Sequence, residues 1–179
     1  KQGTKCIEYF LKNLNIPSQV HDGAGLSRTN LLTPKGMVTL LSHIKSSDAY
    51  LCIYTSLPES SQSGTLRFFP KIPDAYLRAK TGSMDNIYNL AGYVTLGPKQ
   101  YAFSIFCNHY KGPLSDIKNE IVLFLDLLIE KLDQWGKNKE STMELFVIFS
   151  KIETGAASGI LRANLGIITV CSNAYCPDI

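Results

Sequence analysis

Three strand-like runs in succession, followed by one long apolar helix, constrain the fold of this chain more than any other feature. The runs cover residues 75–81, 88–96 and 100–110 and are enriched in Tyr, Val, Ile and Phe, which favour strands. Their short connections predict antiparallel neighbours. Residues 115–134 carry apolar side chains around most of a helical circumference, which predicts a helix that lies between other layers. Together these patterns predict an α/β domain with this helix packed on one face of the sheet.

The first part of the chain predicts two short helices separated by a glycine loop. Residues 4–15 place apolar side chains at helical spacing and predict an amphipathic helix. Residues 21–28 read HDGAGLSR, and the two glycines predict a tight loop with positive φ angles. Thr33 and Pro34 predict the cap and the first residue of a second helix. The mixed segment 46–73 predicts a surface loop.

Composition excludes several classes of function. The chain has 179 residues and 45% hydrophobic content, enough for one compact domain with a sizeable core and too few for two ordinary domains. The formal charge is only +3, and no basic run forms a stripe that could follow a phosphate backbone, so no nucleic acid partner is expected. No apolar run reaches the roughly 18 residues of a membrane span, so none is expected in this chain.

The cysteines predict neither a metal site nor a disulfide framework. They show no Cys-x-x-Cys pair and no zinc spacing, and isolated buried thiols are the preferred interpretation. A bond between Cys171 and Cys176 in an oxidising compartment is the alternative. Because the chain starts at Lys1 and its apolar pattern begins at once, we expect a piece of a longer protein, so the lack of a signal peptide says nothing about export. The five cysteines are Cys6, Cys52, Cys107, Cys171 and Cys176.

One tripeptide, Lys80-Thr81-Gly82, combines residue types suited to binding a peptide's free carboxylate. An ammonium and a hydroxyl can hold the carboxylate, and a glycine leaves room for a substrate backbone against a strand edge. The next amide, that of Ser83, can point at a carbonyl oxygen. A tripeptide of common residues also arises by chance at a solvated strand end. An ordinary structural α/β domain is therefore an alternative.

Two longer segments carry a resemblance to a known family. Residues 79–84 and 87–94 resemble the stretch of penicillin-binding proteins in which Ala-Lys-Thr-Gly leads through a turn into Asn-Leu-Ala-Gly-Tyr. Residues 22–30 are similar to the Asp-Gly-Ser-Gly-Leu-Ser-Arg-x-Asn segment of class C low-molecular-mass penicillin-binding proteins, and only Ala24 departs. Over about residues 4–133 the chain resembles the D-alanyl-D-alanine carboxypeptidase/endopeptidase family.

The resemblance implies a transpeptidase/β-lactamase-like fold, an antiparallel sheet of about five strands with helices on both faces, incomplete in this chain. Residues 1–135 would form the C-terminal part of that domain. Residues 136–179 would be an extension of unknown role. The implied location of the full-length protein is the periplasm, where the family's peptidoglycan substrate lies.

The family's activity is serine-type acyl transfer without metal or organic cofactor, acting on peptidoglycan stem peptides that end in D-Ala-D-Ala and inhibited by β-lactams. On this resemblance Lys80 would be catalytic, and the substrate-binding residues would be Thr81, Gly82 and Ser83, the last through its amide. The interpretation of three further residues near the site is structural, with two capping the glycine loop and one anchoring it. These residues are Asp22, Ser27 and Arg28.

The sequence contains two Ser-x-x-Lys spacings, but neither is expected to supply the nucleophile. Ser42 precedes Lys45 near the end of a predicted helix, and Ser115 precedes Lys118 where a serine is most simply a helix N-cap. The family's nucleophile and its Ser-x-Asn segment would both lie before Lys1, so we expect this chain to be inactive alone. The histidines show no triad with an acid and are not assigned a role. They are His21, His43 and His109.

Two alternatives stay open at this point. The chain could be a catalytically inactive, peptidoglycan-binding or truncated member of the family, or the ordinary structural domain named above. The residues do not separate carboxypeptidase from endopeptidase activity.

Overall fold

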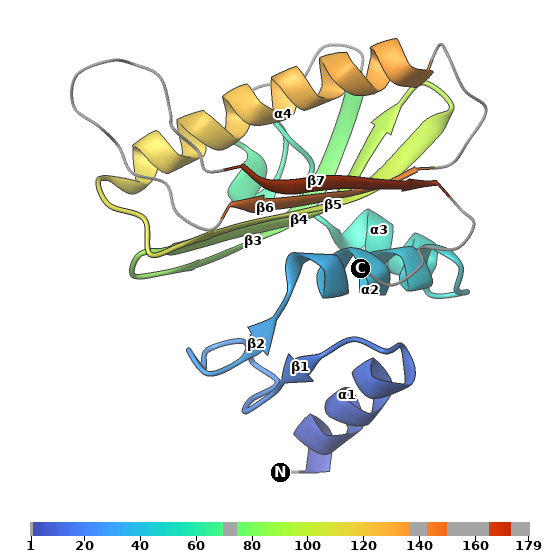
Figure 1. Cartoon of the computed structure of the whole chain (residues 1–179), viewed down its shortest axis with the longest axis vertical. Helices are drawn as coiled ribbons and strands as arrows, with labels where there is room; N and C mark the ends of the chain where they lie inside the picture. The colour runs from blue at the N-terminus through green and yellow to red at the C-terminus, as the bar shows by residue number, and fades with distance from the viewer. Residues whose placement is uncertain (1, 70–74, 137–142, 150–164, 173–179) are drawn as a thin grey trace.

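A five-stranded sheet with helices on both faces forms the centre of the molecule (Figure 1). The structure is a computed structural model, and it describes residues 2–69, 75–136, 143–149 and 165–172. The long helix α4 lies along one face of the sheet, while α2 and α3 lie on the other. The helices are α1 (Gln2–Asn13), α2 (Pro34–Lys45), α3 (Tyr50–Ser56), the 3-10 helix η1 (Gly64–Leu66) and α4 (Leu114–Gly136).

The sheet follows the order β3-β4-β5-β6-β7, so β3 is an edge strand. Its strands are β3 (Ala75–Met84), β4 (Ile87–Leu96), β5 (Lys99–Asn108), β6 (Met143–Phe149) and β7 (Leu165–Ser172). A separate two-stranded ribbon joins β1 (Ser18–Gln19) to β2 (Leu31–Leu32). The two tight turns of the main sheet are Asp85-Asn86 and Gly97-Pro98. Asn86 and Gly97 take positive φ angles of 58° and 57°, which Asn and Gly tolerate best.

One pairing in the sheet is parallel. The pairs β3–β4 and β4–β5 are antiparallel, as predicted, and β6–β7 is antiparallel too, but β5 pairs with β6 in parallel. The reason is the connection, because the chain leaves β5, crosses one face of the sheet as α4 and returns beside β5. The two strands of the region after residue 135 therefore belong to the same sheet as β3–β5. The division of the chain after residue 135 stays a prediction.

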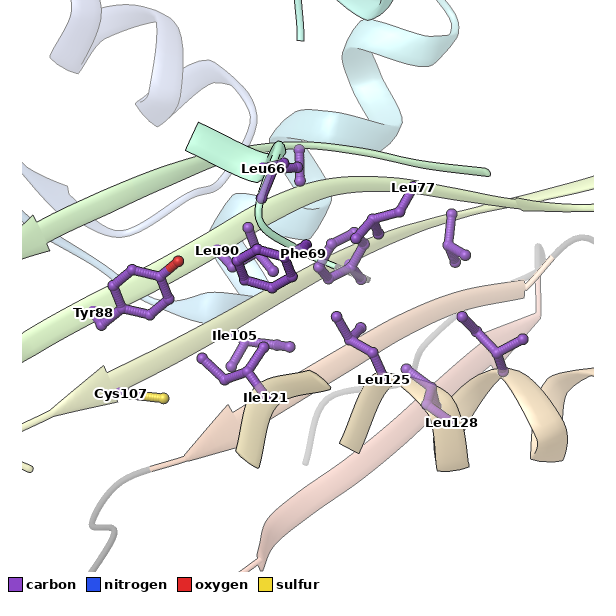
Figure 2. Close-up of a cluster of buried hydrophobic side chains, with 14 of the residues drawn as sticks. Leu66, Phe69, Leu77, Tyr88, Leu90, Ile105, Cys107, Ile121, Leu125 and Leu128 are labelled. Atoms are coloured by element: carbon purple, nitrogen blue, oxygen red, sulfur yellow. The ribbon is translucent and has the colours of Figure 1, made fainter. Parts of the chain in front are cut away.

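The larger core lies between α4 and the sheet (Figure 2). Alternate residues of the strands point toward α4, as a period of two requires, and meet one stripe of the helix. Cys107 is buried in this core, and burial raises the pKa of its thiol to about 12. The strands contribute Leu77, Leu90, Phe103 and Ile105 among others, and α4 contributes Ile117, Ile121, Leu125 and Leu128.

A smaller core joins the opposite face of the sheet to α2 and α3. Tyr93 is fully buried there, and its hydroxyl donates a hydrogen bond to the carbonyl of Leu41 at 2.7 Å. Burial raises the pKa of the Tyr93 hydroxyl, with the nearby Tyr50 adding to the shift. The cap of α2 is as predicted, because Thr33 Oγ1 accepts the Gly36 amide at 3.0 Å and Pro34 begins the helix.

Several local predictions were wrong. Residues 50–56 form α3, where a loop was expected, because apolar residues such as Tyr54 pack against the sheet. Helix α4 is not covered all round, since Leu123 and Leu127 are 57% and 60% exposed. Two cysteines, Cys6 and Cys52, are exposed rather than buried, and the side chains of Cys171 and Cys176 lie outside what the structure describes.

The predicted fold class is confirmed. A mixed domain with a largely antiparallel sheet and helices on both faces matches the expectation from the sequence. Within the described residues, no helix combines the length and the apolar character needed to cross a membrane.

Candidate active site

The tripeptide Lys80-Thr81-Gly82 lies within β3 on the exposed edge of the sheet. The strand was expected to end at Thr81, but it continues to Met84 because this segment pairs fully with β4. Gly82 is exposed, and a Cβ built on it would find its nearest neighbour, Asn89 Cβ, at 4.0 Å. The space beside Gly82 is therefore open to a ligand.

The side chains of the tripeptide leave the strand on alternate faces of the sheet. The Lys80 side chain points to the α2/α3 face, to which Gly82 presents only its bare α-carbon, while the side chains of Thr81 and Ser83 share the α4 face with the buried Ala79. The Lys80 ammonium reaches the strand edge, where Nζ donates to the backbone carbonyl of Thr81 at 2.6 Å. A ligand anion at this edge can therefore be approached from both faces.

A neighbouring segment covers one part of the β3 edge and stops before the tripeptide. We call residues 57–66 the strap. Its Ser60 amide donates to the Leu77 carbonyl at 2.9 Å, and the Ala79 amide donates to the Pro58 carbonyl at 3.0 Å. Because outward-pointing backbone groups alternate along an antiparallel strand, the amides and carbonyls of Thr81 and Ser83 also point outward. Within the described residues, no backbone segment pairs with them there.

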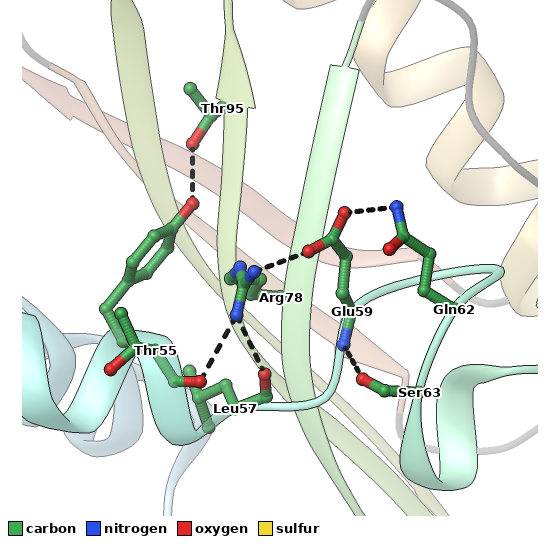
Figure 3. A network of polar contacts seen from close by, with 8 residues as sticks. Thr55, Leu57, Glu59, Gln62, Ser63, Arg78 and Thr95 are labelled. Carbon is green, nitrogen blue, oxygen red and sulfur yellow. Dashed lines mark hydrogen bonds and ion pairs between the residues drawn. The ribbon is translucent and has the colours of Figure 1, made fainter.

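An ion pair holds the strap on β3 (Figure 3). Arg78 donates to Glu59 at 2.5 Å, and both side chains are largely buried. The Arg78 guanidinium also lies 5.3 Å from the ring centroid of Tyr54. Arg78 and Glu59 each have further hydrogen-bond partners, which offset the cost of burying the ion pair. Arg78 donates to the carbonyls of Thr55 and Leu57, and Glu59 accepts from the Gln62 side chain and donates its amide to Ser63. The strap is thus fixed two residues before Lys80.

A second polar contact joins the strap to the tripeptide itself. Thr81 Oγ1 donates to Thr65 Oγ1 at 2.8 Å. Thr65 belongs to η1, so the 3-10 turn at the end of the strap sets the orientation of the Thr81 hydroxyl.

The glycine loop is organised around Asp22. Its carboxylate accepts the amides of Gly25 at 2.6 Å, Leu26 at 3.2 Å and Ser27 at 2.5 Å. Asn30 adds a side-chain bond to the same carboxylate at 3.2 Å. Gly25 has the positive φ, 74°, that was expected for the loop. Partial burial acts to raise the pKa of Asp22, but the hydrogen bonds outweigh it, so the pKa lies below its ordinary value.

The structure brings the glycine loop to the site through Arg28. Its guanidinium lies 3.0 Å from the carboxylate of Asp85, in the turn that follows β3. The two side chains are 60% and 88% exposed, so this ion pair contributes only about 0–1 kcal/mol and is weakened by salt. It positions the loop beside the end of β3 more than it stabilises the fold. Within the loop, the Ser27 hydroxyl forms a hydrogen bond with the Thr29 hydroxyl, with 2.7 Å between the two Oγ atoms.

The lowered pKa of Asp22 predicts a pH-dependent contribution to stability. A carboxyl whose folded pKa is depressed stabilises the fold above its unfolded pKa and loses that contribution as pH falls through the folded pKa. We expect Asp22→Asn to unfold at lower urea concentration than the wild type at about pH 6, and the difference between the two midpoints to shrink as the pH falls below the unfolded pKa of about 3.9. Asp48→Asn, at an exposed position outside the loop, is the matched control. A difference between the urea midpoints of the wild type and Asp22→Asn that stays constant as the pH falls would contradict this assignment.

Neither Ser-x-x-Lys spacing has the arrangement of an activated nucleophile. Ser42 lies in the last turn of α2, and Lys45 donates to the carbonyl of Gln100 at 3.0 Å. Helix α4 begins at Leu114, one residue before the expected N-cap, and Ser115 Oγ donates to Asp116 at 3.3 Å. Ser42 thus lies far from the N-terminus of its helix, and the Ser115 hydroxyl is directed at a carboxylate.

Comparison with known proteins identifies the family. The model of the D-Ala-D-Ala carboxypeptidase 3 (S13) family matches residues 1–128. The chain belongs to this family. The S13 match ends within α4, and it includes the glycine loop and the whole of β3–β5.

Named relatives agree with this assignment. Penicillin-sensitive carboxypeptidase A of Dictyostelium discoideum is 33% identical over 139 residues, 69% of this chain and 27% of that protein. D-alanyl-D-alanine carboxypeptidase of Actinomadura sp. is 37% identical over 121 residues, 62% of this chain and 22% of that protein. The crystal structure of penicillin-binding protein 4 from Haemophilus influenzae matches with a TM-score of 0.54 and 28% identity, covering 73% of this chain and 31% of that one. The chain thus spans about a quarter of the length of the curated relatives.

Three residues around the candidate site carried no signal in the sequence. Thr65, Glu59 and Asp85 contact Thr81, Arg78 and Arg28 across 16, 19 and 57 positions of sequence. These partners are common residue types in polar segments. No local pattern indicated them.

Proposed function

We propose that this chain supplies the Lys-Thr-Gly strand of a serine-type D-Ala-D-Ala carboxypeptidase/endopeptidase that acts on peptidoglycan peptides through an acyl-enzyme. The observation that carries the proposal is the open edge of β3 at Thr81 and Ser83, flanked by the Lys80 ammonium. A peptide can add to such an edge as a further strand. The nucleophilic serine would come from residues outside this chain.

The covered part of the β3 edge favours a peptide whose chain ends at the site. A peptide that adds antiparallel to β3 directs its C-terminal end toward Ala79, where the strap already occupies the edge. Its terminal carboxylate would then lie beside Thr81, within reach of the Lys80 ammonium and the Thr81 hydroxyl. This supports recognition of a terminal D-alanine. The proposal also includes cutting of peptide cross-bridges.

The chemistry assigned to the site is acyl transfer. The serine would attack the D-Ala-D-Ala carbonyl, D-alanine would leave with the proton, and water would release the acyl group. The Ser83 amide points away from β4 and would donate to the developing oxyanion. Gly82 would leave room for the substrate backbone, and Lys80 would stabilise negative charge and steer the proton. No metal or organic cofactor takes part in this proposal.

We further propose that β-lactams act as mimics of the same substrate and that the full-length protein works in the periplasm. Support for the first comes from the penicillin-sensitive relative in Dictyostelium discoideum. Support for the second comes from the peptidoglycan substrate and from the D-alanyl-D-alanine carboxypeptidase relatives.

Labelling with a fluorescent penicillin tests the proposal. We expect a longer protein that carries this chain together with an upstream Ser-x-x-Lys segment to be labelled covalently, because the two parts form one site. We expect the 179-residue chain to stay unlabelled, because Ser42 lies in the last turn of α2 and the Ser115 hydroxyl donates to Asp116. Labelling of the 179-residue chain at either serine would overturn the proposal that the nucleophile lies elsewhere.

A catalytically inactive family member is the second candidate. The positions of Ser42 and Ser115 favour it for the chain alone. Under this alternative the longer protein would bind peptidoglycan peptides but would not be labelled by penicillin. The same labelling experiment therefore distinguishes an active enzyme from an inactive family member.

A further inference from the structure

A hydrogen bond between two hydroxyls links the strap to the tripeptide. The Oγ1 atoms of Thr65 and Thr81 lie 2.8 Å apart, where Thr65 is exposed and Thr81 is half-buried. The backbone carbonyl of Thr81 accepts from Lys80 Nζ at 2.6 Å. The strap thus holds the hydroxyl of Thr81, and the neighbouring lysine holds its carbonyl.

The residues on either side of Thr65 fix its position in η1. Leu66 is fully buried in the larger core. Gly64 lies against Pro58, because a Cβ built at Gly64 would come within 2.9 Å of Cγ in the proline ring. The carbonyl of Pro58 in turn accepts a backbone amide of β3 at 3.0 Å. Packing on one side and the β3 edge on the other therefore direct the Thr65 hydroxyl at Thr81.

The direction of this hydrogen bond decides whether Thr81 is able to donate to a ligand. A hydroxyl has one hydrogen to donate and two lone pairs that accept. In the structure Thr81 donates its hydrogen to Thr65, so a ligand that needs this donor requires the pair to reverse. Among the described hydrogen bonds, none uses the Thr65 hydroxyl as a donor, so its hydrogen is available to turn toward Thr81. Accepting that hydrogen bond makes Thr81 a stronger donor to the ligand.

We propose that Thr65 is a positioning residue for acylation and acts through the Thr81 hydroxyl. Before a ligand binds, Thr65 fixes the rotamer of Thr81 by accepting its hydrogen. When Thr81 turns that hydrogen to the ligand, Thr65 donates its own hydrogen to the Thr81 oxygen. No covalent bond breaks in this exchange, because two hydroxyl groups only rotate. The inference rests on the proposed function, because it requires that Thr81 binds the substrate.

The test compares rates of labelling by a fluorescent penicillin among variants of the longer protein. Thr65→Val keeps the shape of threonine, and its methyl group leaves no room for a water molecule to replace the hydroxyl. We expect this variant to label about fivefold more slowly, as the net contribution of one hydrogen bond implies. Thr65→Ser keeps a hydroxyl and is expected to restore most of the rate. Thr39→Val is the matched control, because the Thr39 hydroxyl donates to the Lys35 carbonyl of its own helix at 3.0 Å.

Combining Thr65→Val with Thr81→Val separates positioning from a general role in holding the strap. If Thr65 acts through Thr81, Thr65→Val has no further effect once the Thr81 hydroxyl is removed. A role in the strap alone predicts the same fivefold loss in both backgrounds. That result, or a wild-type rate for Thr65→Val, would overturn the inference and leave the proposed function standing. If the wild-type longer protein is not labelled at all, the proposed function fails and the inference fails with it.

Discussion

Lys80→Met is expected to slow penicillin acylation of the longer protein by about 100-fold or more. The ammonium would act where negative charge develops, and removing one such preorganised group from a site commonly costs about two to three orders of magnitude. Lys80 is exposed and lies outside both cores, so the fold should survive the change. The measurement is the time course of covalent labelling with a fluorescent penicillin.

The control for Lys80→Met is Lys12→Met, the same change at an exposed position in α1. It should label at the wild-type rate. An unchanged rate for Lys80→Met, with the fold intact by circular dichroism, would remove Lys80 from the chemistry. That outcome would favour the ordinary structural domain, in which the tripeptide is only part of a strand.

Gly92→Ala is expected to destabilise the fold by about 3 kcal/mol or more. Gly92 pairs directly with Ala79, and a Cβ at position 92 would lie 2.5 Å from Ala79 Cα and 2.7 Å from Ala79 Cβ. The nearest neighbours include the backbone of β3, which cannot rotate away as a side chain can. The added methyl group must therefore push β3 from β4, and overpacking of this kind costs about 1–3 kcal/mol even where side chains can adjust. Urea unfolding of the 179-residue chain measures the change.

Gly3→Ala is the matched control, because a Cβ at Gly3 in α1 would meet nothing within 4 Å. It should leave stability unchanged or raise it slightly, since alanine favours helix over glycine. The Gly92 variant should also lose acylation in the longer protein, because Lys80 pairs with Ala91, the neighbour of Gly92. A Gly92→Ala protein within about 0.5 kcal/mol of the wild type would show that β3 and β4 can separate freely.

The Lys-Thr-Gly strand illustrates how far local sequence carries the candidate site. Its residue types suggested carboxylate binding, and the surrounding segments suggested the family that the comparison confirmed. Because both residues fall in the predicted strand, alternation already placed the side chains of Lys80 and Thr81 on opposite faces. The sequence pattern could not say that β3 is an edge strand, or that it continues past Thr81 to Met84, where β4 supplies a partner for every residue.

By itself, the sequence determined the features that depend on neighbours in the chain. These include the hairpins of β3–β5, the Thr33 cap of α2, the glycine loop around Asp22 and the helical character of α4. Each arises from turn residues, caps or periodicity within a few positions, so local physics is enough to predict it.

Only the tertiary structure decided which part of the β3 edge stays open, where Thr65 and Asp85 lie, and that β5 pairs in parallel with β6. Residues 50–56 form α3 because their apolar side chains pack on the sheet, which the sequence pattern did not indicate. These features join segments far apart in the chain. Their free energy comes from burial and pairing that exist only after folding, and no local pattern of residues encodes them.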